Sequence, residues 1–253
     1  ELLVKQLVRT QMCIFRKENL TLSLTGEFNF KSLLEGEMLQ FNRMLYKMPC
    51  VKAVPSFNME KKNEGFKTAS KVQYVASGGC FEKEGQEYTG ALKVLKTIFS
   101  YDYLWVNVRV TGGAYGCMCN FSRNGYGFFT SYRDPNLSAT LDVYKKAADY
   151  VRNFEAGQRD MTKYIIGTIS GIDQPLEPVA LGERSFHAYQ SGITIEMIQK
   201  ERNQVLDATE ETIRSLADYI EAMMDAETVC AIGNDRKLEE EKEIFKQVSS
   251  LTQ

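Results

Sequence analysis

Histidine is almost absent from this chain of 253 residues, which contains a single one, His187. A catalytic zinc is usually held by a set of histidine, cysteine and carboxylate ligands, and the common helical zinc motifs contain two histidines. The chain therefore cannot supply a two-histidine helix motif by itself. His187 follows Ser185 closely, but no GxSxG turn surrounds that serine, so the pair does not indicate a serine hydrolase. We expect His187 to be structural or solvated.

The chain also lacks an excess of charge and any long apolar segment. Its net charge is −2 and its pI is about 5.7, which gives no electrostatic basis for binding nucleic acid. No apolar run approaches the roughly 20 residues that span a bilayer, and Glu1 begins a charged helical pattern instead of a signal peptide. We expect neither nucleic acid nor a membrane as a partner.

The cysteines indicate a reducing compartment. Six are spread along the chain without a secretory signal, at Cys13, Cys50, Cys80, Cys117, Cys119 and Cys230. We therefore expect free thiols and a cytoplasmic location, or an organelle matrix in a eukaryote. Cys117 and Cys119 would point to the same face of a strand, but the spacing offers no further metal ligands. We expect buried strand cysteines and no metal bound by this chain.

The chain is expected to contain the end of one domain and the whole of another. Residues 1–49 read as a helix over 1–12, a strand over 20–25 and a helix over 30–45. This piece is too small to form its own core, so we interpret it as the C-terminal tail of a preceding α+β domain. A polar linker follows at 50–65. Because residue 1 is not Met, we expect the chain to be part of a longer protein.

Residues 66–253 are expected to form one α+β domain. Strands are predicted at 66–81, 114–120, 126–132 and 228–233, and helices at 88–100, 137–155, 158–171, 194–206, 209–225 and from 234 to near 251. The apolar run at 101–110 fits either a strand or a continuation of the preceding helix. Because strands are grouped before helices, we predict an antiparallel-rich mixed sheet with helices packed on one face.

A cation and a phenol six residues apart are the strongest candidates for a functional site. Arg109 and Tyr115 enclose a glycine-rich turn, and such a pair can hold a peptide carbonyl or an oxyanion. The alternative is a surface ion pair at Arg109 and a half-buried tyrosine. Gly112 and Gly113 favour the functional interpretation because they permit close approach of another polypeptide. The turn lacks the GxxxxGK[ST] and GxGxxG spacings of phosphate loops.

A second short motif at 131–137, SYRDPNL, has a structural interpretation. Asp134 and Asn136 are expected to cap a helix that begins at Leu137, and Pro135 to fix its entry.

Together, the run VRVTGGAYG at 108–116 and SYRDPNL at 131–137 resemble the C-terminal lobe of presequence proteases. These proteases belong to the pitrilysin and insulinase superfamily of zinc metallopeptidases. The run NLTLSLTG at 19–26 resembles the strand that closes the preceding lobe. The resemblance covers essentially the whole chain.

The resemblance implies a long zinc metalloendopeptidase whose two halves close around an unstructured peptide. Zinc and the general base would lie on an HxxEH motif in the N-terminal half, which this chain lacks. Arg109 and Tyr115 would be the catalytic residues of the C-terminal half, with Arg109 on a substrate carbonyl and Tyr115 on the oxyanion. Gly112 and Gly113 would complete the substrate-binding turn.

Three consequences are expected from this resemblance. The partners would be unstructured peptides and the N-terminal catalytic half of the same polypeptide, and zinc would be bound only by the full-length enzyme. The chain alone would be inactive. Two alternatives remain open, a peptidase-like scaffold without a metal site and a free-standing peptide-binding module.

Overall fold

The computed structural model describes residues 1–27, 32, 35–47, 56–57, 60, 62–82 and 86–251. The chain forms two compact units, which are described separately. The first contains Glu1–Met59 and Pro175–Thr194, and the second contains Glu60–Gln174 and Ile195–Gln253. The expected division at 1–49, 50–65 and 66–253 stays a prediction.

The first unit is mainly helical. Among its described residues, the elements are α1 (Leu2–Ile14), η1 (Lys17–Asn19), α3 (Glu37–Met44) and α8 (Pro178–Gln190). The predicted helix at 1–12 is confirmed. The helix predicted at 30–45 is described from Glu37, while Phe30, Leu33 and Leu34 lie outside the described residues. Helix α8 was not predicted, although Pro178 in its first turn suits a helix start.

One prediction for this unit is wrong. Residues 20–25 alternate like a strand, yet none of them is in a strand. A strand is defined by hydrogen bonds to a neighbour, and the described part of the chain provides these residues with no paired strand. The bridge between Arg16 and Tyr46 is the nearest feature of this kind in the unit.

The second unit is built on a sheet of six strands in the order β3-β4-β2-β5-β1-β6. The strands are β1 (Glu64–Thr68), β2 (Gln73–Cys80), β3 (Gly116–Phe121), β4 (Tyr126–Asp134), β5 (Thr228–Asn234) and β6 (Gln247–Ser250). The pairs β3–β4, β2–β4 and β2–β5 are antiparallel, whereas β1 pairs in parallel with both β5 and β6. The predicted antiparallel-rich mixed sheet is confirmed.

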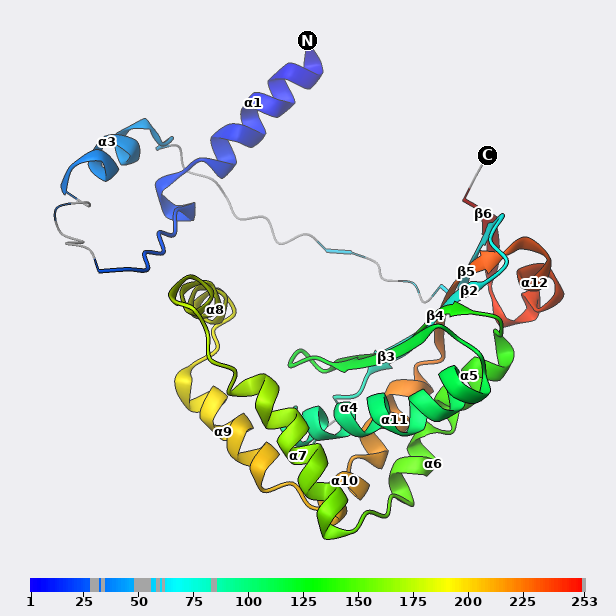
Figure 1. Ribbon diagram of the computed structural model, residues 1–253. Coiled ribbons are helices and arrows are strands. Elements are labelled where there is room, and N and C mark those ends of the chain that lie inside the picture. The colour runs from blue at the N-terminus through cyan, green and yellow to red at the C-terminus, as the bar shows by residue number, and fades with distance from the viewer. Residues whose placement is uncertain are drawn as a thin grey trace. The chain divides into compact units, whose positions relative to one another are not determined.

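Helices cover one face of this sheet (Figure 1). They are α4 (Ala91–Tyr101), α5 (Ser138–Lys145), α6 (Ala147–Arg152), α7 (Gln158–Ile172), α9 (Ile195–Leu206), α10 (Glu210–Arg214) and α11 (Ala217–Asp225). In β5, Val229, Ala231 and Gly233 are buried while the residues between them are exposed. The opposite face keeps large exposed side chains at Tyr74, Met118, Tyr126, Phe128 and Ile232.

The ambiguous run at 101–110 is helical. After α4 the chain forms a wide, π-helical segment, η2 (Trp105–Thr111), and the amide of Gly112 donates to the carbonyl of Asn107 five residues earlier. Val108 is buried against the core from this segment. The strand alternative is therefore wrong, because the apolar residues of this run belong to a helix.

The predicted closing helix is shorter than expected. Helix α12 spans Asp235–Glu240 and is capped by Asn234, whose side chain accepts from the amide of Lys237. A 3-10 turn, η3 (Lys242–Ile244), and strand β6 follow. After η3, Lys246 donates its amide to the carbonyl of Asn63, which places the next residues beside β1.

Candidate functional site

Arg109 projects from η2 and rests on an aromatic ring. Its guanidinium carbon lies 3.9 Å from the centre of the indole ring of Trp105, which precedes it by four residues on the same segment. Such a contact stabilises a cation by about 0.5–1 kcal/mol at an exposed site. The indole therefore restricts where the guanidinium can reach.

Tyr115 follows η2 and is anchored through its backbone. Its amide donates to the carbonyl oxygens of Tyr132, at 3.1 Å, and Arg133, at 3.3 Å. The side chain itself is 63% exposed. Its ring meets that of Tyr132 edge-on with 5.4 Å between centroids, and Tyr132 meets Tyr74 in the same way at 5.5 Å. The phenol is thus held at a defined place while its hydroxyl group stays accessible.

The two glycines between Arg109 and Tyr115 allow the chain to reverse. A β carbon at Gly112 would collide with the carbonyl oxygen of Val108, and Gly113 has a φ of +80°, which side chains disfavour. The amide of Gly113 donates to the carbonyl of Arg109. Both glycines therefore shape the turn that carries the cation and the phenol.

The second motif supports the first one. The side-chain amide of Asn136 donates to the carbonyl oxygen of Gly112 at 2.6 Å. Asp134 is fully buried, and its oxygens accept from the amide of Asn136 and the hydroxyl of Thr140. The structure therefore joins the runs at 108–116 and 131–137 into one site.

The expected capping role of this motif is wrong. Helix α5 begins at Ser138, and no side chain caps it from Leu137. Asp134 and Asn136 do not cap it, because the carboxylate of Asp134 accepts a hydrogen bond from Thr140 and the side-chain amide of Asn136 donates one to Gly112. The amide of Ser138 instead donates to the carboxylate of Glu241 at 2.9 Å.

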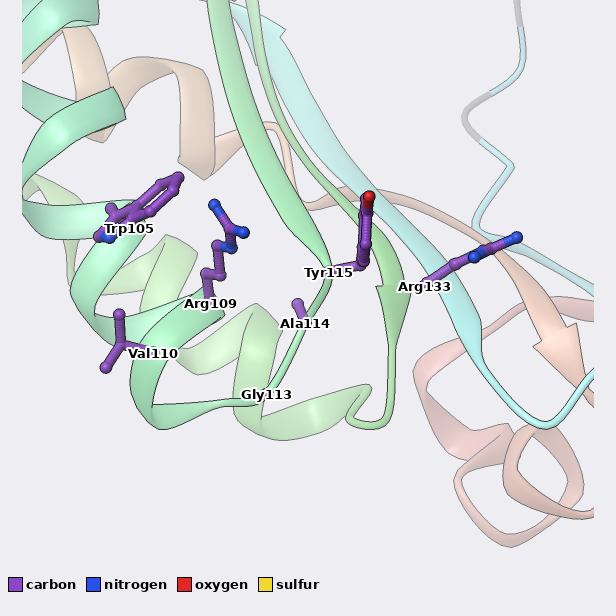
Figure 2. A pocket seen from close by; sticks show the side chains of 7 residues that line it. All are labelled: Trp105, Arg109, Val110, Gly113, Ala114, Tyr115 and Arg133. Carbon is purple, nitrogen blue, oxygen red and sulfur yellow. The ribbon is translucent and has the colours of Figure 1, made fainter.

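These residues surround an open depression of about 600 Å³. It is lined by Trp105, Arg109, Val110, Gly113, Ala114, Tyr115 and Arg133 (Figure 2). Figure 2 shows Arg109 and Tyr115 pointing to the same side, with Trp105 and Arg133 flanking them. The sequence-predicted residues Arg109, Gly113 and Tyr115 are thus brought together, while Gly112 is not one of the lining residues.

Three residues whose side chains contact Arg109 or Tyr115 were not predicted as part of the site. Trp105 is the single tryptophan of the chain and lies one helical turn before Arg109, a signal that would have been visible had the run at 101–110 been read as helix. Tyr132 was predicted to end a strand, and Arg133 stands in a run that was interpreted only as a turn and a helix cap. No sequence pattern indicates that their strand would bend toward Tyr115.

The described residues do not fit a zinc ion. Among them, no group of three or more histidine, cysteine, aspartate or glutamate side chains could hold a metal. Burial raises the pKa of Cys117 to about 11 and that of Cys119 to about 12, which favours protonated thiols over thiolate ligands. His187 is exposed on α8, and the hydroxyl of Ser185 donates to the carbonyl of Leu181.

Among the helices of the described residues, none combines the length and the apolar character needed to cross a bilayer.

The sequence is similar to known proteins over most of its length. Residues 63–234 match the family described as PreP C-terminal domain. The chain is 40% identical over 242 residues to Protein HypA of Clostridium perfringens, covering 94% of this chain and 24% of that protein. It is 35% identical over 174 residues to presequence protease 1, chloroplastic/mitochondrial, of Arabidopsis thaliana, covering 68% of this chain and 16% of the relative.

The fold is also similar to a solved structure. A peptidase M16 inactive domain from Pseudomonas fluorescens superposes with a TM-score of 0.52 at 14% identity, covering 85% of this chain and 50% of that chain. At this identity the match concerns the fold alone.

Proposed function

Because the chain belongs to the PreP C-terminal domain family, we propose that it is the substrate-binding C-terminal part of a zinc-dependent peptidase that degrades unstructured peptides. The chain spans about a quarter of HypA and about a sixth of the Arabidopsis relative. The activity therefore belongs to a longer protein, whose N-terminal half would carry the zinc and the general base.

The observation that carries this proposal is the shared orientation of Arg109 and Tyr115 at one open depression. A peptide bond under attack develops negative charge on its carbonyl oxygen, and a positioned hydroxyl donor stabilises that charge. Tyr115 has an accessible phenol and a fixed backbone, so it suits this role. The zinc of the other half would polarise the carbonyl and activate the nucleophile.

Arg109 would bind the substrate in a more general way. Its guanidinium has several N–H donors, and Trp105 holds it beside the depression. A donor of this kind can hold the carbonyl of a residue next to the scissile bond. Gly112 and Gly113 would contribute by shape, because the turn they form presents no side chain at the depression.

The open face of the sheet supports a peptide substrate without a fixed sequence. Exposed rings at Tyr74, Tyr126 and Phe128 lie on the same sheet as the strand that anchors Tyr115. An unfolded peptide can place its apolar side chains against such a face, whereas a folded protein keeps most of its apolar side chains buried. Selection would therefore depend on the disorder of the substrate.

The experiment that tests the proposal uses the full-length protein and a quenched fluorescent peptide. Tyr115→Phe is expected to lower kcat/KM by about a hundredfold, the usual effect of removing an oxyanion donor. Tyr126→Phe is the matched control, since it removes another exposed phenol of the sheet. Full activity in Tyr115→Phe would contradict the assignment. A full-length protein without zinc or peptidase activity would favour the scaffold alternative.

Two further parts of the proposal concern the chain on its own. Without the N-terminal half it is expected to bind no catalytic zinc and to cleave nothing. The free thiols of Cys80, Cys117, Cys119 and Cys230 support a reducing compartment, the cytoplasm or an organelle matrix.

A further inference from the structure

Strand β4 contains a bulge directly beside Tyr115. Gln73 of β2 pairs with Asp134, but Val75 pairs with Ser131, so Tyr74 faces two residues of β4, Tyr132 and Arg133. Arg133 has a φ of +48°, which is uncommon for a residue with a side chain. Bulges and such backbone outliers concentrate next to functional sites, where they redirect a side chain.

The bulge changes the direction of Arg133. Along β4 the odd-numbered residues Gly127, Phe129 and Ser131 are buried, so continued alternation would bury residue 133. The extra residue shifts the pattern, and Arg133 is exposed while Asp134 is buried. The bulge therefore places Arg133 on the open face with Tyr132, next to the phenol of Tyr115.

Two aromatic rings lie within cation–π distance of the Arg133 guanidinium. Its carbon lies 5.8 Å from the centre of the Tyr115 ring and 5.6 Å from that of Tyr132. Asp134 is adjacent in sequence but buried, and its oxygens accept from Asn136 and Thr140. Within the described residues, Arg133 and Arg109 have ring contacts and no ion-pair partner.

The depression thus carries two unpaired cations and no acid. Its seven lining residues include Arg109 and Arg133 and neither aspartate nor glutamate, although the whole chain has a net charge of −2. A cleft lined by charge of one sign attracts ligands of the other. Guanidinium groups match carboxylates best, because two N–H donors can face two oxygens.

We infer that Arg133 is a specificity-determining residue that binds a carboxylate of the peptide beside Tyr115. The carboxylate would be an acidic side chain near the scissile bond or the α-carboxylate of a short peptide. The inference rests on the proposed function and deepens it: Arg109 holds a backbone carbonyl, Tyr115 acts at the reacting bond, and Arg133 selects among peptides.

The test compares matched peptides with the full-length protein. One series replaces Gln by Glu at one position at a time, and a second exchanges a C-terminal amide for the free acid. The wild type is expected to cleave the acidic member of at least one pair about tenfold faster in kcat/KM, as a charge-assisted hydrogen bond allows. The two series distinguish the side chain from the α-carboxylate.

Two variants show whether Arg133 provides this preference. Arg133→Gln removes the charge, and Arg133→Gly also relieves the left-handed backbone. Both are expected to erase the preference, while Arg159→Gln, a control at an exposed arginine of α7, retains it. If the preference for the acidic peptide persists in Arg133→Gly, Arg133 has only a structural role in the bulge and the inference is overturned. A wild type that shows no preference for the acidic peptides would overturn it as well.

The same peptide pairs are measured as dissociation constants by fluorescence anisotropy. This arm tests the carboxylate preference even if no peptide is cleaved. Failure of the proposed function appears as no turnover of any peptide, whereas failure of this inference appears as equal treatment of the acidic and neutral members.

Discussion

The side chain of Asn136 donates a hydrogen bond of 2.6 Å to the carbonyl oxygen of Gly112 and so joins two motifs 24 residues apart in the chain. The first motif carries Arg109 and Tyr115, and the second carries the bulge residue Arg133. Together with the backbone hydrogen bonds of Tyr115 to Tyr132 and Arg133, this contact holds the turn that carries Arg109 and Tyr115 against the second motif.

Asn136→Ala is expected to lower activity more than stability. Loss of the hydrogen bond costs about 1 kcal/mol in the free energy of unfolding, while displacement of the turn lowers kcat/KM of the full-length protein by about tenfold. Asn153→Ala is the control, because Asn153 donates a similar bond to the carbonyl of Asp149 at 2.8 Å outside the site. Equal kcat/KM in Asn136→Ala and Asn153→Ala would show that the hydrogen bond of Asn136 does not contribute to activity at the site.

Trp105→Leu is expected to weaken substrate binding. The indole ring holds the Arg109 guanidinium, and loss of a cation–π contact corresponds to about a threefold to fivefold change in affinity. Trp105→Phe should retain part of the affinity for the peptide, because a smaller aromatic ring remains beside the Arg109 guanidinium. The measurement is the dissociation constant of an uncleaved peptide, with the rate of cleavage at saturation unchanged. An unchanged affinity in Trp105→Leu would show that Arg109 needs no aromatic support.

Glu201→Gln is expected to destabilise the second unit. This carboxylate is buried and pairs with Lys93 at 2.6 Å and with Arg123, in the turn between β3 and β4, at 2.5 Å. We expect a loss of about 2 kcal/mol in urea unfolding, below that of a fully buried pair because both cations are partly exposed. Glu221→Gln, which breaks an exposed pair with Arg152, should cost less than about 1 kcal/mol. Similar losses of unfolding free energy in Glu201→Gln and Glu221→Gln would contradict a stabilising role for the buried ion pairs of Glu201.

Cys119 is expected to resist alkylation in the folded protein. Burial raises its pKa to about 12, and only the thiolate reacts, so at about pH 8 the thiol stays protonated and covered. Its reactivity should appear only when the pH approaches the raised pKa or when urea unfolds the sheet. Exposed Cys80 is the internal control in the same mass-spectrometric experiment. Rapid modification of Cys119 at neutral pH would contradict the packing of β3.

The sequence predicted the elements whose periodicity is local. The hairpin of β3 and β4 and helices α7 and α9 lie close to where the pattern placed them. Helix α12 was extended too far, because β6 depends on a parallel pairing with a strand more than 180 residues away, Gln247 opposite Glu64. Pairing between distant segments leaves no local signal.

The central residues of the site were predicted from the sequence, but the residues that position them were not. Arg109 and Tyr115 were recognised from the glycine turn and the resemblance, and the structure brings them to one depression. Arg133 was missed because the strand was predicted to end at residue 132, whereas β4 continues through a bulge that depends on pairing with the distant strand β2. Asn136 was interpreted as a helix cap, because its contact with Gly112 depends on tertiary folding.

The measurement that tests the central claim most directly compares two ligands of the full-length protein. A phosphinic peptide imitates the tetrahedral transition state, and an uncleavable peptide of the same sequence imitates the substrate. Tyr115→Phe is expected to weaken binding of the phosphinic peptide by about a hundredfold and binding of the substrate-like peptide by less than about threefold. Equal weakening of both ligands would show that Tyr115 binds peptides without stabilising the oxyanion, and would contradict the role assigned to it.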